Sequence, residues 1–291
     1  MQLYRIETGK VKVKQKQITS KKGLFPKFGK IIFDDEWSEW LPIYSWVIDH
    51  PEGLILVDTG ETYRTGNKNY LPKWHPYYAF AVKFKVELND EIGHQLSEMG
   101  INPFKDISKV IMTHLHTDHA GGLYHFPAAE IIVHRKEWIK ASGITGLLAG
   151  YLPHRWPSWL NPTLIDFGGS KHGPFPNSFS VTKDRKVIIV STPGHTPGHI
   201  SVIVEMDGYH YFLAGDASYN QYNMINLKAD GVGEKAQSLE TLKKIKLFSA
   251  FNPTIYLPSH DPEVPYRMDN KVLASENIHQ KSIIIKDQKQ G

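Results

Sequence analysis

Runs of apolar residues, either alternating with polar residues or uninterrupted, predict the strands of this protein. Between Lys10 and Lys14 lysine alternates with valine, so the lysines face one side of a strand and the valines face the other. Lysine commonly protects the open edge of a sheet, and we therefore expect this strand to lie at an edge. The other apolar runs predict strands at residues 41–48, 54–57, 110–112, 130–134, 186–192, 200–206, 209–214 and 254–257.

Helical periodicity occurs between these strands. Residues 89–99 place apolar side chains on one face, and Gly100 follows them, which is typical of the end of a helix. Residues 135–141 resemble a short helix, and residues 234–251 have the pattern of a long amphipathic helix. The sequence therefore predicts three helices among the strands.

Two segments, 61–85 and 143–180, show no regular pattern. The first is rich in aromatic residues and the second in Gly, Pro and Trp, so we expect two long loops. Each loop is either a lid over a pocket or a connection packed by its own side chains. The aromatic residues that could line an apolar channel are Trp74, Tyr77, Tyr78, Trp156 and Trp159.

The order of the predicted elements indicates the fold class. Strands occur in runs with helices between them on both sides of the midpoint, and no Pro- or Ser-rich linker divides the chain. This order predicts an α/β fold with two sheets inside and helices outside. We expect a single domain over residues 1–291, with its core at about residues 31–265.

The composition is that of a folded globular chain and excludes several kinds of chemistry. With 291 residues, 41% of them hydrophobic, the chain can build a sizeable core. Cysteine is absent, which excludes disulfides, thiolate ligands and a cysteine nucleophile. A net charge of +4 is too small to indicate nucleic-acid binding, and no apolar run resembles a signal peptide or membrane helix. We expect a cytoplasmic monomer or homodimer that binds neither nucleic acid nor membrane.

Four side chains that can bind metal lie within six positions after the predicted strand 110–112. The motif H-x-H-x-D-H consists of His114, His116, Asp118 and His119. In an extended segment His114 and His116 project to the same side, so they can share one ion. The other two side chains reach a second ion from the following turn. Imidazole and carboxylate ligands suit zinc, with iron, manganese and cobalt as alternatives.

Three further strands each deliver one candidate ligand just past their ends. Strand 186–192 is followed by His195, strand 209–214 by Asp216, and strand 254–257 by His260. A metal site needs ligands from separate parts of the chain. We therefore expect these side chains to join the motif.

On these residues the chain resembles the metallo-β-lactamase fold superfamily, and within it the N-acyl homoserine lactonases that quench quorum sensing. The family signature H-x-H-x-D-H corresponds to residues 114–119, and its T-P-G-H element corresponds to residues 192–195. Its strand-end aspartate and last histidine correspond to Asp216 and His260. The resemblance spans roughly residues 40–265 and implies a four-layer αββα sandwich.

The resemblance also implies a reaction on N-acyl homoserine lactones. It implies that His114, His116 and His195 hold one divalent ion, that Asp118, His119 and His260 hold a second, and that Asp216 bridges both. A hydroxide that bridges the two ions then attacks the lactone carbonyl and opens the ring. The resemblance gives Tyr219 a hydrogen bond to the carbonyl oxygen, and Asp118 is placed to pass a proton to the leaving alkoxide.

Nearby residues are expected to support this site. Asp58 matches a recurrent element of the superfamily and is expected to orient a ligand without touching metal. His199 follows the T-P-G-H element and is expected to form structural hydrogen bonds. Thr117 stands where several lactonases carry an aromatic residue.

Two other functions remain open from the sequence. A thioester hydrolase of the glyoxalase II kind has the same seven ligands, but the segment after Asp216 differs, and we see no carboxy-terminal helical region with a basic cluster. A non-catalytic metal-binding relative would not need the complete ligand set. The common dinuclear β-lactamases use a cysteine ligand, which this chain lacks.

Overall fold

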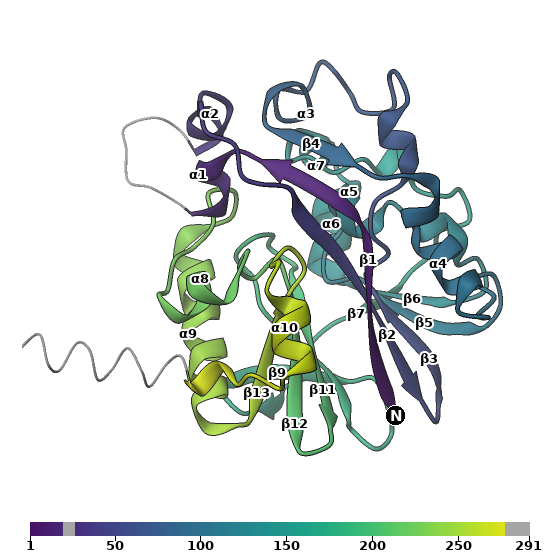
Figure 1. Ribbon diagram of the computed structural model, residues 1–291, viewed down its shortest axis with the longest axis vertical. Coiled ribbons are helices and arrows are strands. Elements are labelled where there is room, and N and C mark those ends of the chain that lie inside the picture. The colour runs from purple at the N-terminus through teal and green to yellow at the C-terminus, as the bar shows by residue number, and fades with distance from the viewer. Residues whose placement is uncertain (20–26, 277–291) are drawn as a thin grey trace, which may run out of the picture.

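Two β-sheets lie face to face in the centre of the molecule (Figure 1). The structure is a computed structural model that describes residues 1–19 and 27–276. The first sheet has the order β4-β1-β2-β3-β5-β6-β7 and the second has the order β13-β12-β11-β10-β9-β8. The strands of the first sheet are β1 (Gln2–Val13), β2 (Leu41–His50), β3 (Gly53–Val57), β4 (Val82–Lys85), β5 (Ile107–Ile111), β6 (Glu130–His134) and β7 (Thr163–Ile165). Those of the second are β8 (Ser170–His172), β9 (Phe175–Ser180), β10 (Val187–Ser191), β11 (Ile200–Met206), β12 (Tyr209–Gly215) and β13 (Thr254–Pro258).

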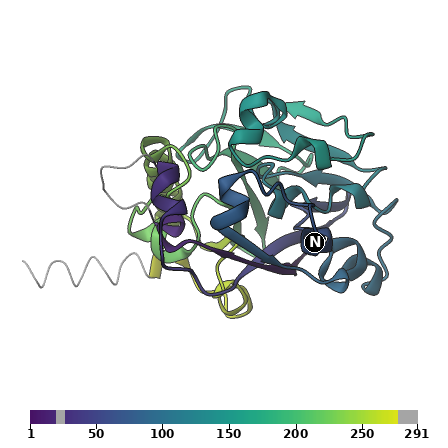
Figure 2. The ribbon, with the colours of Figure 1, turned by 90° about the horizontal axis from the view of Figure 1, so that it is seen from above.

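Helices cover the outer face of each sheet, as Figures 1 and 2 show. The helices are α1 (Gln15–Ile18), α2 (Lys27–Ile32), α3 (Pro76–Phe80), α4 (Ile92–Glu98), α5 (Thr117–Ala120), α6 (Arg135–Ser142), α7 (Ile144–Leu148), α8 (Gln221–Ile225), α9 (Lys235–Phe251) and α10 (Val264–Asp269). Apolar residues of α4 and α6 pack on the first sheet, and those of α8 and α9 pack on the second. The four-layer αββα sandwich predicted from the sequence is therefore confirmed. No helix in the described part of the chain is long and apolar enough to cross a membrane.

The main core lies between the two sheets. Trp46 and Ile48 of β2 are fully buried there against side chains of the second sheet such as Ile189 and Leu213. Burial of an aliphatic side chain such as Ile48, Ile189 or Leu213 stabilises the folded state by about 1.5–3 kcal/mol. Because both faces of the inner strands are covered, their sequences are almost continuously apolar. This core fixes the strand ends that carry the candidate site.

The prediction that the lysine-bearing strand lies at a sheet edge is wrong. β1 pairs with β2 on one side and with β4 on the other, and Lys10–Val13 lies opposite Val82–Lys85. The alternation is present only in part, since Val11 and Val13 are buried and Lys10 is exposed, but Lys12 is half-buried and Lys14 is buried. The edge strand is β4, which comes from the segment expected to be a loop.

Residues 61–85 and 143–180 are not the long loops that the sequence indicated. The first segment contains α3 and β4, and the second contains α7 and three short strands, β7 to β9, which join both sheets. The core also begins before residue 31, since β1 buries Leu3 and Ile6. The expectation of one domain over residues 1–291 includes residues 20–26 and 277–291, which lie outside the described residues.

Several strands end at the same edge of the sandwich. β3, β5 and β6 are parallel neighbours, so their carboxyl ends meet on one side of the first sheet. In the second sheet β12 and β13 are parallel, and β10 runs in their direction because β10 and β12 are both antiparallel to β11. The residues after β5, β10, β12 and β13 are therefore brought together.

Candidate metal centre

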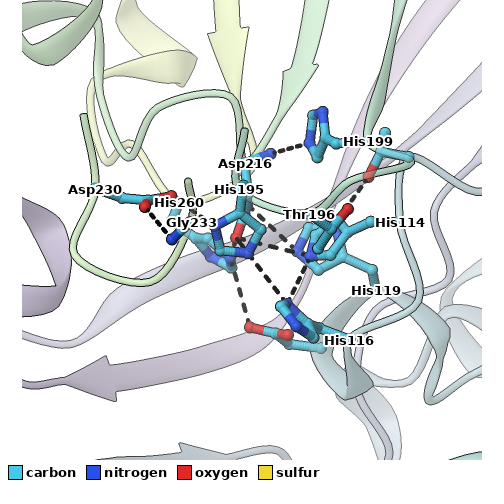
Figure 3. A network of polar contacts seen from close by, with 12 residues as sticks. His114, His116, His119, His195, Thr196, His199, Asp216, Asp230, Gly233 and His260 are labelled. Carbon is cyan, nitrogen blue, oxygen red and sulfur yellow. Dashed lines mark hydrogen bonds and ion pairs between the residues drawn. The ribbon is translucent and has the colours of Figure 1, made fainter. Parts of the chain in front are cut away.

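Residues that follow four different strands converge on one buried cluster (Figure 3). His114 and His116 lie in the loop after β5, and Asp118 and His119 lie in α5 directly after it. The residues that follow β10, β12 and β13 in the cluster are His195, Asp216 and His260. All seven candidate ligands named from the sequence fall into groups whose ligand atoms lie within 4.8 Å of one another.

Three imidazoles form the first group. His116 Nδ1 lies 3.1 Å from His114 Nε2 and 3.1 Å from His195 Nε2. Nitrogen ligands at about 2.0–2.1 Å from a tetrahedral zinc ion are separated from one another by about 3.3 Å. The spacing of these ring nitrogens therefore fits three ligands of one ion.

The carboxylate of Asp216 lies between the first group and a second one. Its Oδ2 is 3.5 Å from His195 Nε2 and 4.0 Å from His114 Nε2. Its Oδ1 is 3.3 Å from both His119 Nε2 and His260 Nε2. Each carboxylate oxygen thus faces a different set of imidazoles, which is the arrangement of a bridging ligand.

The second group is completed by Asp118. Its Oδ2 lies 3.5 Å from His260 Nε2, and its side chain is the more exposed of the two, at 17%. The buried atoms His119 Nε2 and Asp216 Oδ1 lie 3.3 Å apart, but neither forms a hydrogen bond within residues 1–19 and 27–276. Buried polar atoms without hydrogen bonds are costly, and a cation bound by both atoms would satisfy them. The donor set and these two atoms fit a divalent metal ion.

Hydrogen bonds behind the cluster fix the orientation of the imidazoles. Asp58 Oδ2 lies 2.8 Å from His119 Nδ1, which agrees with the orienting role expected for Asp58. His260 Nδ1 lies 2.8 Å from the carbonyl oxygen of Pro42. In each ring Nδ1 donates its hydrogen to an oxygen behind the cluster, so that Nε2 faces the centre.

His195 has a carboxylate partner that the sequence did not reveal. Asp230 Oδ2 lies 2.6 Å from His195 Nδ1, and Asp230 Oδ1 accepts the backbone N–H groups of Val232 and Gly233 at 3.1 and 2.7 Å. Burial opposes protonation of His195, but Asp230 outweighs it and raises the pKa of His195 to about 9. No strand precedes Asp230, so the strand-end rule could not identify it.

Burial and neighbouring charge set the protonation of the other groups. Burial lowers the pKa of His114 and His116 well below the usual value, and nearby imidazoles lower it further. Burial opposes ionisation of Asp216, but His260 and His119 hold the pKa of its carboxyl well below the usual range. Burial opposes protonation of His119 and His260 as well, but Asp216 outweighs it and raises the pKa of both. Neutral His114 and His116 and an ionised Asp216 are in the form that binds a metal ion, whereas a metal ion at His119 and His260 would compete with a proton.

Two further side chains hold the metal-binding loops together. Glu137 of α6 accepts hydrogen bonds from the Leu115 N–H at 3.1 Å and from the Thr196 hydroxyl at 2.7 Å, so it ties the loop after β5 to the loop after β10. His199 accepts the N–H of Asp216 at 3.0 Å through Nε2. This is the structural hydrogen bond expected for His199, and Figure 3 shows it beside the cluster.

A narrow cavity, partly open to solvent, leads to the cluster. It is lined by Gln17, Ile31, Tyr77, Tyr78, Phe84, His116, Thr117, Asp118, Ala149, Gly150, His195, Asp216, Tyr219 and Val232. Of the five aromatic residues proposed for a channel, Tyr77 and Tyr78 line this cavity. Trp156 instead stacks on Trp138, and Trp74 is 61% exposed. No pattern in the sequence indicated Gln17 as a residue of this cavity.

Proteins of one known family match most of this chain. The sequence profile of the metallo-beta-lactamase superfamily matches residues 38–280. An N-acyl homoserine lactonase from Bacillus sp is 30% identical over 225 residues, which are 77% of this chain and 82% of that protein. The lactonase AttM of Azorhizobium caulinodans is 24% identical over 90% of this chain and 94% of its own length.

A solved structure shows the same fold. It is an N-acyl homoserine lactone hydrolase with the product N-hexanoyl-L-homoserine bound at the catalytic metal centre, and its identity to this chain is 25%. The TM-score is 0.72, over 91% of this chain and 94% of that one. With the shared profile, the two-sheet fold and the convergent histidines and aspartates, this chain belongs to the metallo-beta-lactamase superfamily.

Proposed function

We propose that this protein is a dinuclear metal-dependent hydrolase that opens the lactone ring of N-acyl homoserine lactones. The observation that carries the proposal is the position of Asp216, whose two carboxylate oxygens face different groups of imidazoles at 3.3–4.0 Å. The relatives named as N-acyl homoserine lactonases cover most of the chain and support the substrate class.

In this proposal two divalent ions, most suitably zinc, are bound by seven side chains. His114, His116 and His195 hold one ion, Asp118, His119 and His260 hold the other, and Asp216 bridges them. Bound there, the two ions would polarise a carbonyl group and lower the pKa of a shared water. The protein's own contribution is to orient the imidazoles, through partners such as Asp58 and Asp230.

Tyr219 is proposed to donate a hydrogen bond to the carbonyl oxygen of the substrate. Its side chain is 4% exposed, lines the cavity beside Asp216, and stacks on His260 with ring centroids 5.7 Å apart. Burial raises the pKa of the Tyr219 phenol well above its usual value, and the neighbouring Tyr77 and Asp216 raise it further. The phenol therefore keeps its proton at neutral pH and can act as a donor.

Asp118 is proposed to take the proton from the oxygen that has added to the carbonyl carbon and to pass it to the alkoxide that leaves when the ring opens. It is the second residue of α5, lies at the wall of the cavity and is partly exposed, so a substrate oxygen can reach its carboxylate. The apolar side chains of Ile31, Tyr78 and Phe84 line the same cavity and suit an acyl chain.

The test is hydrolysis by the zinc-loaded protein, followed with a pH indicator. N-hexanoyl homoserine lactone should be opened with about two equivalents of metal bound, and a glutathione thioester should be a much poorer substrate. Faster hydrolysis of the thioester would instead support the glyoxalase II-like alternative, and a protein without metal and without activity would support a non-catalytic relative.

Three substitutions separate metal binding from catalysis. His116→Ala and Asp216→Asn should lose metal and most activity. Tyr219→Phe should keep its metal and lose about 10²-fold in kcat, which is the usual loss when one donor to a developing oxyanion is removed. Unchanged lactone hydrolysis by Tyr219→Phe would contradict the role proposed for Tyr219.

A further inference from the structure

Gln17 of helix α1 places a buried amide in the wall of the cavity. Its side chain comes from a segment far from the metal-binding motifs in sequence, and it is 3% exposed. Its Nε2 donates a hydrogen bond to the Tyr219 hydroxyl at 2.7 Å and another to the Tyr77 hydroxyl at 2.9 Å. One amide group therefore contacts the residue that the proposed function places against the substrate carbonyl.

These hydrogen bonds determine which way the Tyr219 hydroxyl can donate. A primary amide nitrogen carries two hydrogens, and here each is directed at one phenol oxygen. Because Tyr219 accepts from Gln17, its own hydrogen must turn away from Gln17. The Tyr219 ring cannot follow, since it is stacked on His260 at an interplanar angle of 29°. The hydrogen is left to be donated into the cavity.

The backbone around Gln17 is fixed against a loop of the metal centre. The Gln17 carbonyl accepts the N–H of Gly231 at 2.8 Å, and the Ile18 carbonyl accepts the side-chain N–H of Asn223 at 2.8 Å. Gly231 directly follows Asp230, the partner of His195. Figure 1 shows α1 next to α8 at this point. The amide is thus held in place relative to the same loop that orients a candidate ligand.

The amide keeps this orientation although its oxygen is left without a partner. Gln17 Oε1 is buried and forms no hydrogen bond within the part of the chain that the structure describes. An unpaired buried acceptor usually costs about 1–3 kcal/mol. Departures of this kind from full hydrogen bonding are concentrated at functional sites.

We propose that Gln17 is a positioning residue, which holds Tyr219 as a hydrogen-bond donor towards the carbonyl oxygen of the substrate. The inference rests on the proposed function, because it requires a substrate with a carbonyl group at the metal centre. It adds a residue from the amino-terminal part of the chain to the machinery of the reaction. It also states what that residue does, which is to supply N–H groups and not an acceptor.

The test is Gln17→Glu, which keeps the size of the side chain and reverses its hydrogen bonding. A carboxylate has no hydrogen to donate, so it would accept the hydrogen of Tyr219 and withdraw it from the substrate. We expect kcat for lactone opening to fall about 10²-fold, as for removal of the donor itself, with KM and metal content little changed. Gln15→Glu is the matched control, because Gln15 lies in the same helix and is exposed, and it should have wild-type kcat.

A double-mutant cycle separates positioning from a merely structural role. In a Tyr219→Phe background there is no phenol hydrogen to misdirect, so Gln17→Glu should lower kcat by less than about twofold. The proposal is overturned if Gln17→Glu has wild-type kcat, or if it loses as much activity in the Tyr219→Phe background as in the wild type.

Two further measurements keep the proposal testable. If Gln17→Glu does not fold, as judged by circular dichroism, Gln17→Met takes its place. It removes the donors without adding an acceptor, and its smaller loss of kcat should again vanish in the Tyr219→Phe background. If the wild-type protein does not open homoserine lactones, the proposed function fails, and the same cycle is run on the ester or thioester that it does hydrolyse.

Discussion

The carboxylate of Asp230 should control how tightly the neighbouring metal ion is held. Asp230 serves two sets of donors at once, since Oδ2 faces His195 while Oδ1 accepts the N–H groups of Val232 and Gly233. Asparagine has only one acceptor oxygen. In Asp230→Asn the side chain can serve the imidazole or the backbone groups, but not both.

The size of the effect follows from the contact that is lost. A hydrogen bond to a charged group at 2.6 Å contributes about 1.5–3 kcal/mol. The same carboxylate raises the pKa of His195 to about 9, and thereby its basicity towards metal. Removing a carboxylate behind a ligating histidine weakens metal binding by about 10- to 100-fold, or about 1.4–2.7 kcal/mol. The two figures agree, so we expect zinc affinity to fall within that range.

The assay is competition for zinc with a chromophoric chelator, followed by lactone hydrolysis at saturating zinc. Asp230→Asn should release one equivalent of zinc more readily and regain much of its kcat when zinc is in excess. Asp166→Asn is the matched control, because Asp166 is exposed and pairs only with Arg135 in the described structure, at 2.7 Å. Equal zinc affinity of Asp230→Asn and the wild type would refute the argument that Asp230 stabilises His195 as a ligand.

Three other predictions concern stability. Glu61 is fully buried, and burial raises its pKa to about 8 from the usual 4.5, so in this pH range unfolding releases a proton and the free energy of unfolding falls as pH rises. The free energy of unfolding of Glu61→Gln minus that of the wild type should therefore increase between pH 5 and pH 8.5, by on the order of 3–5 kcal/mol as measured by urea unfolding. Chelation of the metal should lower Tm by about 5–10 °C in calorimetry, since bound ions stabilise only the folded state. Gly194→Ala should lower the free energy of unfolding by more than about 2 kcal/mol, because Gly194 has φ +148° and an added methyl group would lie 2.5 Å from Ser238 Cα.

Each of these predictions has a control or an outcome that contradicts it. A difference between Glu61→Gln and the wild type that does not change with pH would contradict a raised pKa of Glu61. Zinc added back after chelation should restore Tm, and an unchanged Tm after chelation would contradict a metal centre. Gly208→Ala, at φ +78° with nothing within 4 Å of the added methyl group, should lose only about 1 kcal/mol. Equal losses at the two glycines would exclude the clash with Ser238.

The parts of the fold that the sequence predicted are those whose signal is local. β10 and β12 are buried on both faces, so their apolar runs identify them without knowledge of their neighbours. β8 (Ser170–His172) contains no apolar residue, and its strand conformation depends on pairing with β9. The internal position of β1 likewise depends on β4, which no pattern in residues 61–85 indicates.

The candidate site divides in the same way. The seven candidate ligands have chemically distinctive side chains in a dense motif or directly after a strand, and both features can be recognised in one sequence. Asp230 and Gln17 act through contacts that exist only after folding, between a loop and His195 and between a short helix and two tyrosines. An aspartate before a glycine and a glutamine in a lysine-rich segment are too common to be noticed beforehand.

The amino-terminal helix has a consequence for how this protein can diversify. The superfamily profile begins at residue 38, whereas Gln17 and Ile31 of the cavity wall precede it. Part of the cavity wall is therefore built from residues that precede the matched profile. Random substitution of residues 27–35, which include Ile31 and leave Gln17 unchanged, should alter which substrates the proposed hydrolase accepts and leave its metal content intact, which makes this stretch the economical target for directed evolution.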